Sequence, residues 1–345
     1  MQRHKRNNEK HNYPYPSSSY PENLGTVGLW IIVFSIIYNH LRLAVNMASL
    51  FLLLETQNIQ YTMLRIAIQT KGRLNEESIA MLNSIDINVD NAKRKFLSKA
   101  SNFPIEVLYL RDDDIPGVVA NNTAQLGIVG LNEVEEKQAD VEIVAKLGWG
   151  GCRISLAIPK EEEYTGVEYF NGKRIATSYP GILERFLEKN GVKATIEVIT
   201  GSVEIAPAAG IADAIFDIVS SGGTLVTNGL KEVERVFESE AVLIANKEMS
   251  DEDKELLDEI MFRIESERVS VKKKYLLMNV PAQNLDKALQ ILPSMRSPTV
   301  MPLADKEWYS LHSVVDAGEL WDKVKQLKAI GAEGILVLSL DKIIL

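Results

Sequence analysis

Short apolar runs alternate with amphipathic segments along most of the chain, and this alternation limits the possible folds more than any other feature. Runs such as 64–68, 105–110 and 126–130 are typical of buried strands, while residues 180–190 and 251–268 have the apolar spacing of helices. Only a few residues connect successive elements. Such an order predicts an α/β architecture built on parallel sheets.

Two sheets of this kind would form two lobes, with the chain crossing near residue 150 and returning near residue 232. A final long strand, Val236–Ala245, would follow. Ligands of open α/β sheets bind at the carboxyl ends of the strands. We therefore expect a cleft lined by residues 69–73 and 111–117 from one lobe and by 177–181 and 217–224 from the other.

The segment Ala212–Leu230 joins a buried strand to a loop of small polar residues. That loop consists of Ser220, Ser221, Gly222, Gly223 and Thr224. Glycines let the backbone approach a ligand closely, and N–H and hydroxyl groups donate hydrogen bonds, so the loop suits a phosphate. Asp213 and Asp217 would repel phosphate but accept hydrogen bonds well from a ribose diol. The pattern predicts a sugar-phosphate site; a strand that ends in a flexible turn is the alternative.

A basic turn follows the strand 64–68. Lys71 and Arg73 flank Gly72 there, and two cations at a strand end suit a polyphosphate, although a solvated turn explains them equally well. Asn75 is expected to cap the next helix, and Ser250 the helix at about 251–268.

Three adjacent acids, Asp112, Asp113 and Asp114, follow the strand 105–110. Because like charges repel, either Arg111 with nearby lysines or a Mg²⁺ ion should offset them. We expect Asp114 to cap the next helix, with Pro116 in its first turn.

Composition excludes several classes of protein. The net charge of −9 provides no global basic surface for nucleic acid. The four histidines lie at 4, 11, 40 and 312, so a Ser-His-Asp triad, a Cys-His pair or a histidine zinc site in the middle of the chain is excluded. A single cysteine, Cys152, fits a reducing compartment. Catalysis in the core would depend on carboxylates, Lys, Arg, backbone donors and a hard metal such as Mg²⁺.

The two ends of the chain have their own patterns. Residues 1–62 combine a polar start with apolar runs, which allows an upstream extension of the gene model, a membrane anchor or an export signal. The first interpretation is favoured because Met63 directly precedes a clean strand. After Ser270 the expected order βαββαβ predicts a small ferredoxin-like domain.

Ten positions within 204–225 fit the signature of the ATP phosphoribosyltransferase family, the first enzyme of histidine biosynthesis. They are Glu204, Gly210, Ala212, Ile215, Asp217, Ile218, Ser221, Gly222, Thr224 and Leu225. From Met63 to Leu345 the chain resembles the long form of this family. Residues 1–62 depart from the family pattern, so a membrane role is not expected.

The resemblance implies a bilobal core like that of periplasmic binding proteins, with lobes at 63–150 plus 233–269 and at 151–232. An ACT-like domain at 270–345 would bind histidine as a feedback inhibitor. The implied reaction condenses ATP with phosphoribosyl pyrophosphate to N1-(5-phosphoribosyl)-ATP and pyrophosphate, with Mg²⁺ held mainly by substrate phosphates. A cytoplasmic homo-oligomer, from dimer to hexamer, is expected.

The same resemblance suggests roles for individual residues. The loop 220–224 would hold the 5-phosphate, and Asp217, Asp213 and Arg73 would act at the reacting ribose. The expected nucleotide-side residues are Lys71, Gly72, Arg94, Asp112, Asp113 and Tyr179. Thr299 and Ser313 are the expected effector contacts. A solute-binding protein of the same bilobal fold and a transcription regulator are the rival interpretations.

Overall fold

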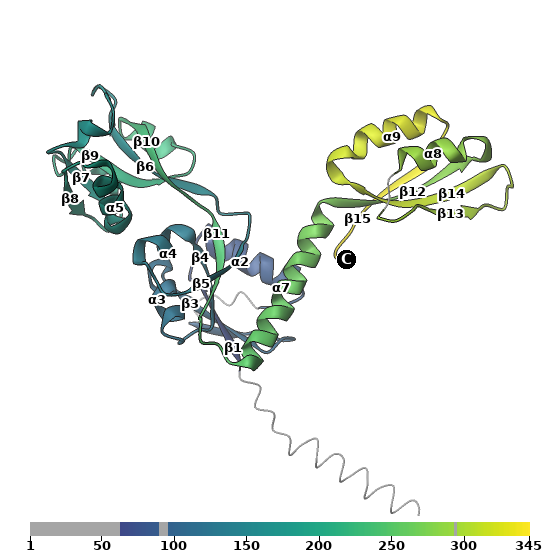
Figure 1. The fold of residues 1–345 in the computed structure, drawn as a ribbon, viewed down its shortest axis with the longest axis horizontal. Coiled ribbons are helices and arrows are strands. Elements are labelled where there is room, and N and C mark those ends of the chain that lie inside the picture. Colours follow the sequence, from purple (N-terminus) through teal and green to yellow (C-terminus); the bar gives the residue numbers. More distant parts are fainter. Residues whose placement is uncertain (1–62, 90–95, 293–294) are drawn as a thin grey trace, which may run out of the picture. The chain divides into compact units, whose positions relative to one another are not determined.

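The structure is a computed structural model that describes residues 63–89, 96–292 and 295–345. These residues belong to one compact unit and form three sheets (Figure 1). The interpretations of residues 1–62 and the role predicted for Arg94 lie outside the described residues. In the part of the chain that the structure describes, no helix is both long and apolar enough to span a membrane.

The first lobe is built on a six-stranded sheet of order β2-β3-β1-β4-β11-β5. Its strands are β1 (Leu64–Gln69), β2 (Leu97–Lys99), β3 (Ile105–Leu110), β4 (Leu126–Gly130), β5 (Glu142–Lys146) and β11 (Ala241–Ala245). Its helices are α2 (Arg73–Ser84), α3 (Ile115–Ala120), α4 (Leu131–Lys137) and α7 (Asp251–Val271). The central strands are buried along most of their length, which explains their continuous apolar sequences.

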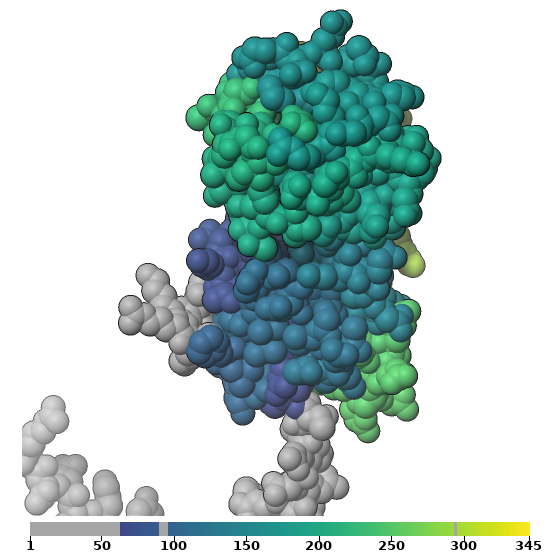
Figure 2. Space-filling view, turned by 90° about the vertical axis from the view of Figure 1, so that its left-hand side faces the viewer, coloured from purple at the N-terminus to yellow at the C-terminus, as the bar shows by residue number. Residues whose placement is uncertain are grey.

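The second lobe has a five-stranded sheet of order β10-β6-β9-β7-β8. Its strands are β6 (Cys152–Pro159), β7 (Arg174–Thr177), β8 (Thr195–Val198), β9 (Ala214–Val219) and β10 (Leu230–Ser239). Its helices are α5 (Pro180–Asn190) and α6 (Gly223–Thr227). Figure 2 shows outer surfaces of both lobes, the first in purple to blue and the second in teal to green.

The two sheets share one topology, which confirms the predicted bilobal α/β core. In the first sheet β1 lies between β3 and β4, and in the second β7 lies between β8 and β9; β4 and β9 then each pair with an antiparallel strand, β11 or β6. Both sheets are therefore mixed, whereas the sequence predicted parallel sheets. β6 and β11 are each the first strand formed after the chain crosses from the other lobe, and β2 adds an antiparallel edge to the first sheet.

The return crossing also differs from its prediction. Residues 236–245 are not one strand: β10 pairs with β6 up to Ser239, and β11 pairs with β4 from Ala241. The change of sheet therefore occurs at Glu240, not near residue 232. Both halves have strand-like sequences, so hydrophobic periodicity does not reveal the change.

The structure confirms only some of the predicted helix caps. Ser250 caps α7 as expected, with its hydroxyl accepting a 3.1 Å hydrogen bond from the Asp253 N–H. Asn75 does not cap α2, which begins at Arg73; its amide donates instead to the Gln69 carbonyl at 2.6 Å. Asp114 occupies the N-cap position of α3 and Pro116 lies in the first turn, as predicted, but the Asp114 side chain makes no capping hydrogen bond.

The C-terminal domain confirms the predicted βαββαβ order. Its elements are β12 (Lys273–Pro281), α8 (Leu285–Ile291), β13 (Thr299–Pro302), β14 (Trp308–Asp316), α9 (Leu320–Ala329) and β15 (Glu333–Ser339). The sheet order is β13-β14-β12-β15, with α8 and α9 on the same face (Figure 1). Leu276 and Leu311 from the strands and Leu327 from α9 are fully buried together in its core.

Candidate active site

The predicted phosphate loop lies directly after β9. Ser220, Ser221 and Thr224 are exposed, and Gly222 has a left-handed backbone with φ of +79°. Glycine adopts that conformation without a steric penalty, so the tight turn between β9 and α6 depends on it. The geometry matches the sequence prediction of an open, polar turn at a strand end.

Asp217 lies within β9, a few residues before this loop. Burial raises the pKa of its carboxyl to about 6, and the nearby Glu204 adds to the rise. The Ile218 N–H opposes it by donating a 2.8 Å hydrogen bond to Asp217 Oδ1. A buried carboxylate that remains largely ionised at neutral pH can stabilise positive charge on a nearby group.

Asp213 occupies a different environment, at the opposite end of β9. Its carboxyl forms an ion pair with the Arg174 guanidinium, Oδ1 to Nη2 at 3.1 Å, and accepts a 2.9 Å hydrogen bond from the Arg174 N–H. These contacts lower its pKa. Asp213 and Asp217 are four positions apart in extended chain, which separates their backbones by about 13 Å. The two carboxylates cannot hold one ribose diol together, so we correct Asp213 to a structural role.

A cavity of about 220 Å³ brings residues of both lobes together. It includes three predicted site residues: Arg73 and Asp112 from the first lobe and Ser220 from the second. Its other lining residues are Gln69, Leu74, Glu77, Gly130, Asn132, Glu133, Gly150, Gly151, Cys152 and Ile218. The cavity therefore adjoins the strand ends of the first lobe and the phosphate loop, but residues 177–181, which were also expected at the cleft, do not line it.

The basic and acidic turns of the first lobe are arranged by local pairs. Arg73 begins α2, and its Nε donates to Glu77 Oε1 at 2.9 Å, while Lys71 is exposed. Gly72 has φ of +94°, which favours glycine. These two cations remain accessible to a phosphorylated ligand.

The neighbouring acids Asp112 and Asp113 have different partners. Asp112 accepts a 3.2 Å hydrogen bond from the Gln69 side chain, and Asp113 forms an ion pair with Arg111 at 3.1 Å. Arg111 thus provides the partner that the sequence required, and among the predicted acids only Asp112 lines the cavity.

Tyr179 was expected on the nucleotide side of the site, but it does not line the cavity. Its hydroxyl belongs instead to a buried hydrogen-bond network. It donates to Glu133 Oε1 at 3.0 Å, and the Asn132 amide contacts the same hydroxyl at 3.3 Å. Ser239 closes the network through a 2.7 Å hydrogen bond to Asn132. Burial raises the pKa of Glu133 to about 7, although the hydrogen bond from Tyr179 lowers it. Sequence reasoning missed Glu133, whose only signal was an acid in the first turn of α4, directly after a strand.

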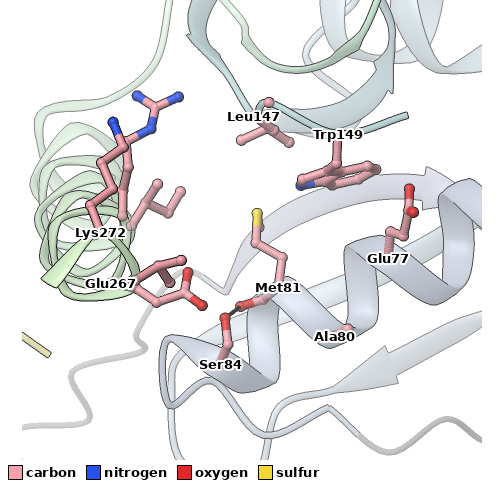
Figure 3. Close-up of a pocket in the computed structure, with 12 residues that line it drawn as sticks. Glu77, Ala80, Met81, Ser84, Leu147, Trp149, Glu267 and Lys272 are labelled. Carbon is pink, nitrogen blue, oxygen red and sulfur yellow. Dashed lines mark hydrogen bonds between the residues drawn. The ribbon is translucent and has the colours of Figure 1, made fainter. Parts of the chain in front are cut away.

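A wider cavity of about 670 Å³ lies between α2, residues 147–149 and the end of α7 (Figure 3). Met81, Leu147 and Trp149 give it an apolar wall. None of the predicted site residues lines it, and Glu77 is its only residue shared with the smaller cavity. Chemistry rather than size therefore identifies the smaller cavity as the candidate active site.

The predicted effector residues do not share a surface. Thr299 pairs with His312 across β13 and β14, so these two side chains project from one face of the sheet. The neighbouring Ser313 faces the other side, where it is buried at 3% exposure, and its hydroxyl has no hydrogen-bond partner among the described residues. One ligand cannot contact both from one side of the sheet.

Within residues 63–89, 96–292 and 295–345, no group of three or more His, Cys, Asp or Glu side chains is placed to hold a metal ion. A phosphate loop at a cavity between two α/β lobes is a feature of enzymes that bind phosphorylated sugars or nucleotides, although Asp217 itself does not line that cavity. Comparison with known families makes this class specific. The family model described as ATP phosphoribosyltransferase matches residues 111–266, and its C-terminal domain model matches residues 271–342.

Curated relatives agree with the family models. A Bacteroides fragilis ATP phosphoribosyltransferase is 58% identical over 283 residues, which are 82% of this chain and 100% of the relative. A relative of the same name from Azobacteroides pseudotrichonymphae is 52% identical over 283 residues, again 82% of this chain and 100% of the relative. The chain belongs to the ATP phosphoribosyltransferase family, the first enzyme of histidine biosynthesis.

A solved structure supports the same fold. The ATP phosphoribosyl transferase (HisG:HisZ) complex from Thermotoga maritima contains a chain with 27% sequence identity and a TM-score of 0.52. The match covers 59% of this chain and 96% of that chain.

Proposed function

We propose that the chain condenses ATP with phosphoribosyl pyrophosphate to form N1-(5-phosphoribosyl)-ATP and pyrophosphate. The observation that carries the proposal is the cavity in which Arg73 and Asp112 of the first lobe meet Ser220 of the phosphate loop. The family of the chain supports the same reaction.

The second lobe would hold the activated sugar. The loop Ser220–Thr224 presents hydroxyl and backbone N–H groups to the 5-phosphate, and Asp217 accepts hydrogen bonds from the ribose hydroxyls. When the bond from C1 to pyrophosphate breaks, positive charge develops on the ribose. The Asp217 carboxylate stabilises that charge from a fixed position in β9, so it needs no reorganisation during the reaction.

The first lobe would hold the leaving group and the nucleotide. Arg73 and Lys71 supply positive charge to substrate phosphates, and Asp112 lies on the nucleotide side of the cavity. The attacking atom, N1 of adenine, carries a lone pair, so no general base is required. This agrees with a core whose described residues include no histidine before His312.

Magnesium fits this site as an ion carried largely by the substrate. Protein carboxylates near the cavity, such as Asp112, provide the oxygen ligands that Mg²⁺ prefers, and the ion usually retains substrate phosphates and waters as its remaining ligands. When bound, Mg²⁺ would neutralise charge on the leaving pyrophosphate.

Pyrophosphate release with both substrates and Mg²⁺ tests the proposal. We expect release only when ATP and phosphoribosyl pyrophosphate are both present, together with a product of the summed mass less pyrophosphate. A solute-binding protein of the same fold would bind a ligand and release nothing, which would contradict the proposed reaction.

We also propose that the C-terminal domain binds histidine as a feedback inhibitor, in a cytoplasmic homo-oligomer. The match of residues 271–342 to the C-terminal domain model and the βαββαβ fold support the regulatory role. The apolar residues Leu336 and Leu338 are half-exposed on β15, which supports self-association. Titration with L-histidine should raise the melting temperature and inhibit the reaction, and light scattering should report the oligomer; no change on histidine addition would contradict the regulatory role.

A further inference from the structure

We propose that Arg153 is a positioning residue for the phosphate loop and that Glu232 holds Arg153 in its working orientation. The proposal rests on the function proposed above for the loop Ser220–Thr224. It concerns a side chain on β6, which the sequence analysis assigned to no role.

The Arg153 side chain connects three neighbouring strands. Its Nη1 donates to the carbonyl of Ser220 at 2.9 Å, at the point where β9 becomes the loop. A longer contact of 3.5 Å reaches the carbonyl of Val219. On its other side, Nε and Nη2 each donate at 2.6 Å to a separate oxygen of Glu232 on β10.

Glu232 is also held in place by a second residue of β6. The Ser155 hydroxyl, two residues along β6 from Arg153, donates to Glu232 Oε1 at 2.8 Å. Hydrogen bonds from Arg153 and Ser155 lower the pKa of Glu232, so the pair stays ionised throughout the neutral range. A two-point guanidinium–carboxylate contact defines the plane of the guanidinium as well as its position.

Arg153 affects the phosphate loop by orienting its backbone rather than through its charge. The carboxylate of Glu232 neutralises the charge of Arg153, so little net field reaches the loop. What remains is a fixed N–H donor that holds the Ser220 carbonyl. Because the Ser220 carbonyl and the Ser221 N–H belong to one planar peptide, holding one fixes the direction of the other. The loop would therefore meet the sugar phosphate with its donors already oriented.

The opposite end of β9 provides a matched control. There, Arg174 pairs with Asp213 at 3.1 Å and donates to the carbonyls of Gly210 and Ile211 at 3.1 and 2.7 Å. Both arginines thus join a carboxylate to main-chain carbonyls at an end of the same strand. Only Arg153 contacts the phosphate loop.

The experiment compares Arg153→Met, Arg153→Lys and Arg174→Met in the full chain. We expect Arg153→Met to raise the KM for phosphoribosyl pyrophosphate about tenfold, the effect of losing one hydrogen bond to an oriented group, with a much smaller change in the KM for ATP. Arg153→Lys should not rescue this loss, because an ammonium lacks the planar fork. Arg174→Met should lower the melting temperature comparably and leave both KM values near wild type.

Two results would overturn the proposal. One is recovery of the wild-type KM in Arg153→Lys, which would show that charge alone matters. The other is an equal rise in KM for Arg174→Met, which would show a general effect of destabilising β9.

Hydrogen exchange provides a readout that does not depend on the reaction. Without substrates, amides of residues 220–224 should exchange faster in Arg153→Met than in wild type or Arg174→Met. If wild type releases no pyrophosphate but this difference is present, the proposed reaction fails and the positioning role stands. Equal loop exchange in all three proteins would reject the positioning role itself.

Discussion

The Tyr179 hydroxyl at the start of α5 donates a 3.0 Å hydrogen bond to Oε1 of Glu133 at the start of α4, joining the two lobes through a buried carboxyl group. Glu133 also lines the candidate active site, whereas Tyr179 does not. A side chain of one lobe therefore orients an acid of the other. Opening the lobes would break this bond and expose Glu133 to water.

Removing the Tyr179 hydroxyl should destabilise the protein in a pH-dependent way. In Tyr179→Phe the ionised Glu133 loses a donor, so the free energy of unfolding should fall by about 1–2 kcal/mol at pH 8 and by less at pH 5, where Glu133 is protonated. Denaturant unfolding at both pH values measures the difference. Tyr169→Phe is the control, since its hydroxyl makes only an exposed 3.4 Å contact with Glu162 and its loss should have little effect. Equal losses at the two pH values would contradict the role given to ionised Glu133.

Replacing Glu133 by glutamine should flatten the dependence of stability on pH. Because the folded-state pKa of about 7 lies above the usual value of 4.5, the wild-type protein has the full stability contribution of this group below about pH 4 and loses it as the pH rises through 7. We expect the free energy of unfolding of Glu133→Gln to fall less between pH 5 and pH 8 than that of wild type, by about 2 kcal/mol. Parallel pH profiles for the two proteins would show that Glu133 is not the titrating group.

Asp217→Asn should lower the activity of the enzyme and raise its stability. We expect kcat to fall by about a hundredfold or more, because the charge that stabilises the ribose is lost. At pH 7.5 the melting temperature should rise, since burial of the ionised carboxylate raises its pKa to about 6 and opposes folding. In wild type, kcat should likewise decline as the pH falls below about 6. A near-normal kcat in the variant would refute the role of Asp217.

The matched variant Asp213→Asn should behave in the opposite way. It breaks the partly exposed ion pair with Arg174, so stability should fall by up to about 1 kcal/mol. Because the pKa of Asp213 is lowered, its stabilising contribution is present at neutral pH and is lost on acidification. Steady-state kinetics should show kcat close to wild type. A large loss of kcat would restore the catalytic role that we have withdrawn.

Gly222→Ala should disturb the phosphate loop through its backbone. A side chain at φ of +79° costs about 1 kcal/mol, so the loop should relax and the KM for phosphoribosyl pyrophosphate should rise. Gly229→Ala introduces similar strain at φ of +70° outside the loop, where an added Cβ meets no atom within 4 Å. It should show a similar stability loss with an unchanged KM. Equal KM values for phosphoribosyl pyrophosphate in the two variants would show that the backbone of this turn does not contribute to substrate binding.

Many features of the fold could be predicted from short segments. The strand Leu126–Gly130, the helix Pro180–Asn190 and the Ser250 cap match their predictions because each depends on nearby residues. The loop after β9 was also visible, since glycines and hydroxyls next to a buried strand are local signals. The site could be predicted only in part: Arg73, Asp112 and Ser220 meet at one cavity, but Tyr179 and Asp213 have other partners.

By itself, the sequence determined the alternating α/β elements, the phosphate loop, the C-terminal βαββαβ unit and the family, because periodicity and motif spacing are properties of continuous segments. Only the tertiary structure decided that the chain changes sheet at Glu240, that Asp213 and Asp217 have separate roles, and that Glu133 is buried against Tyr179. These outcomes depend on contacts between distant residues, such as the 46 positions that separate Glu133 from Tyr179. Burial and pairing arise only when the lobes fold, and they change the pKa of a carboxyl group without changing any residue in its local sequence.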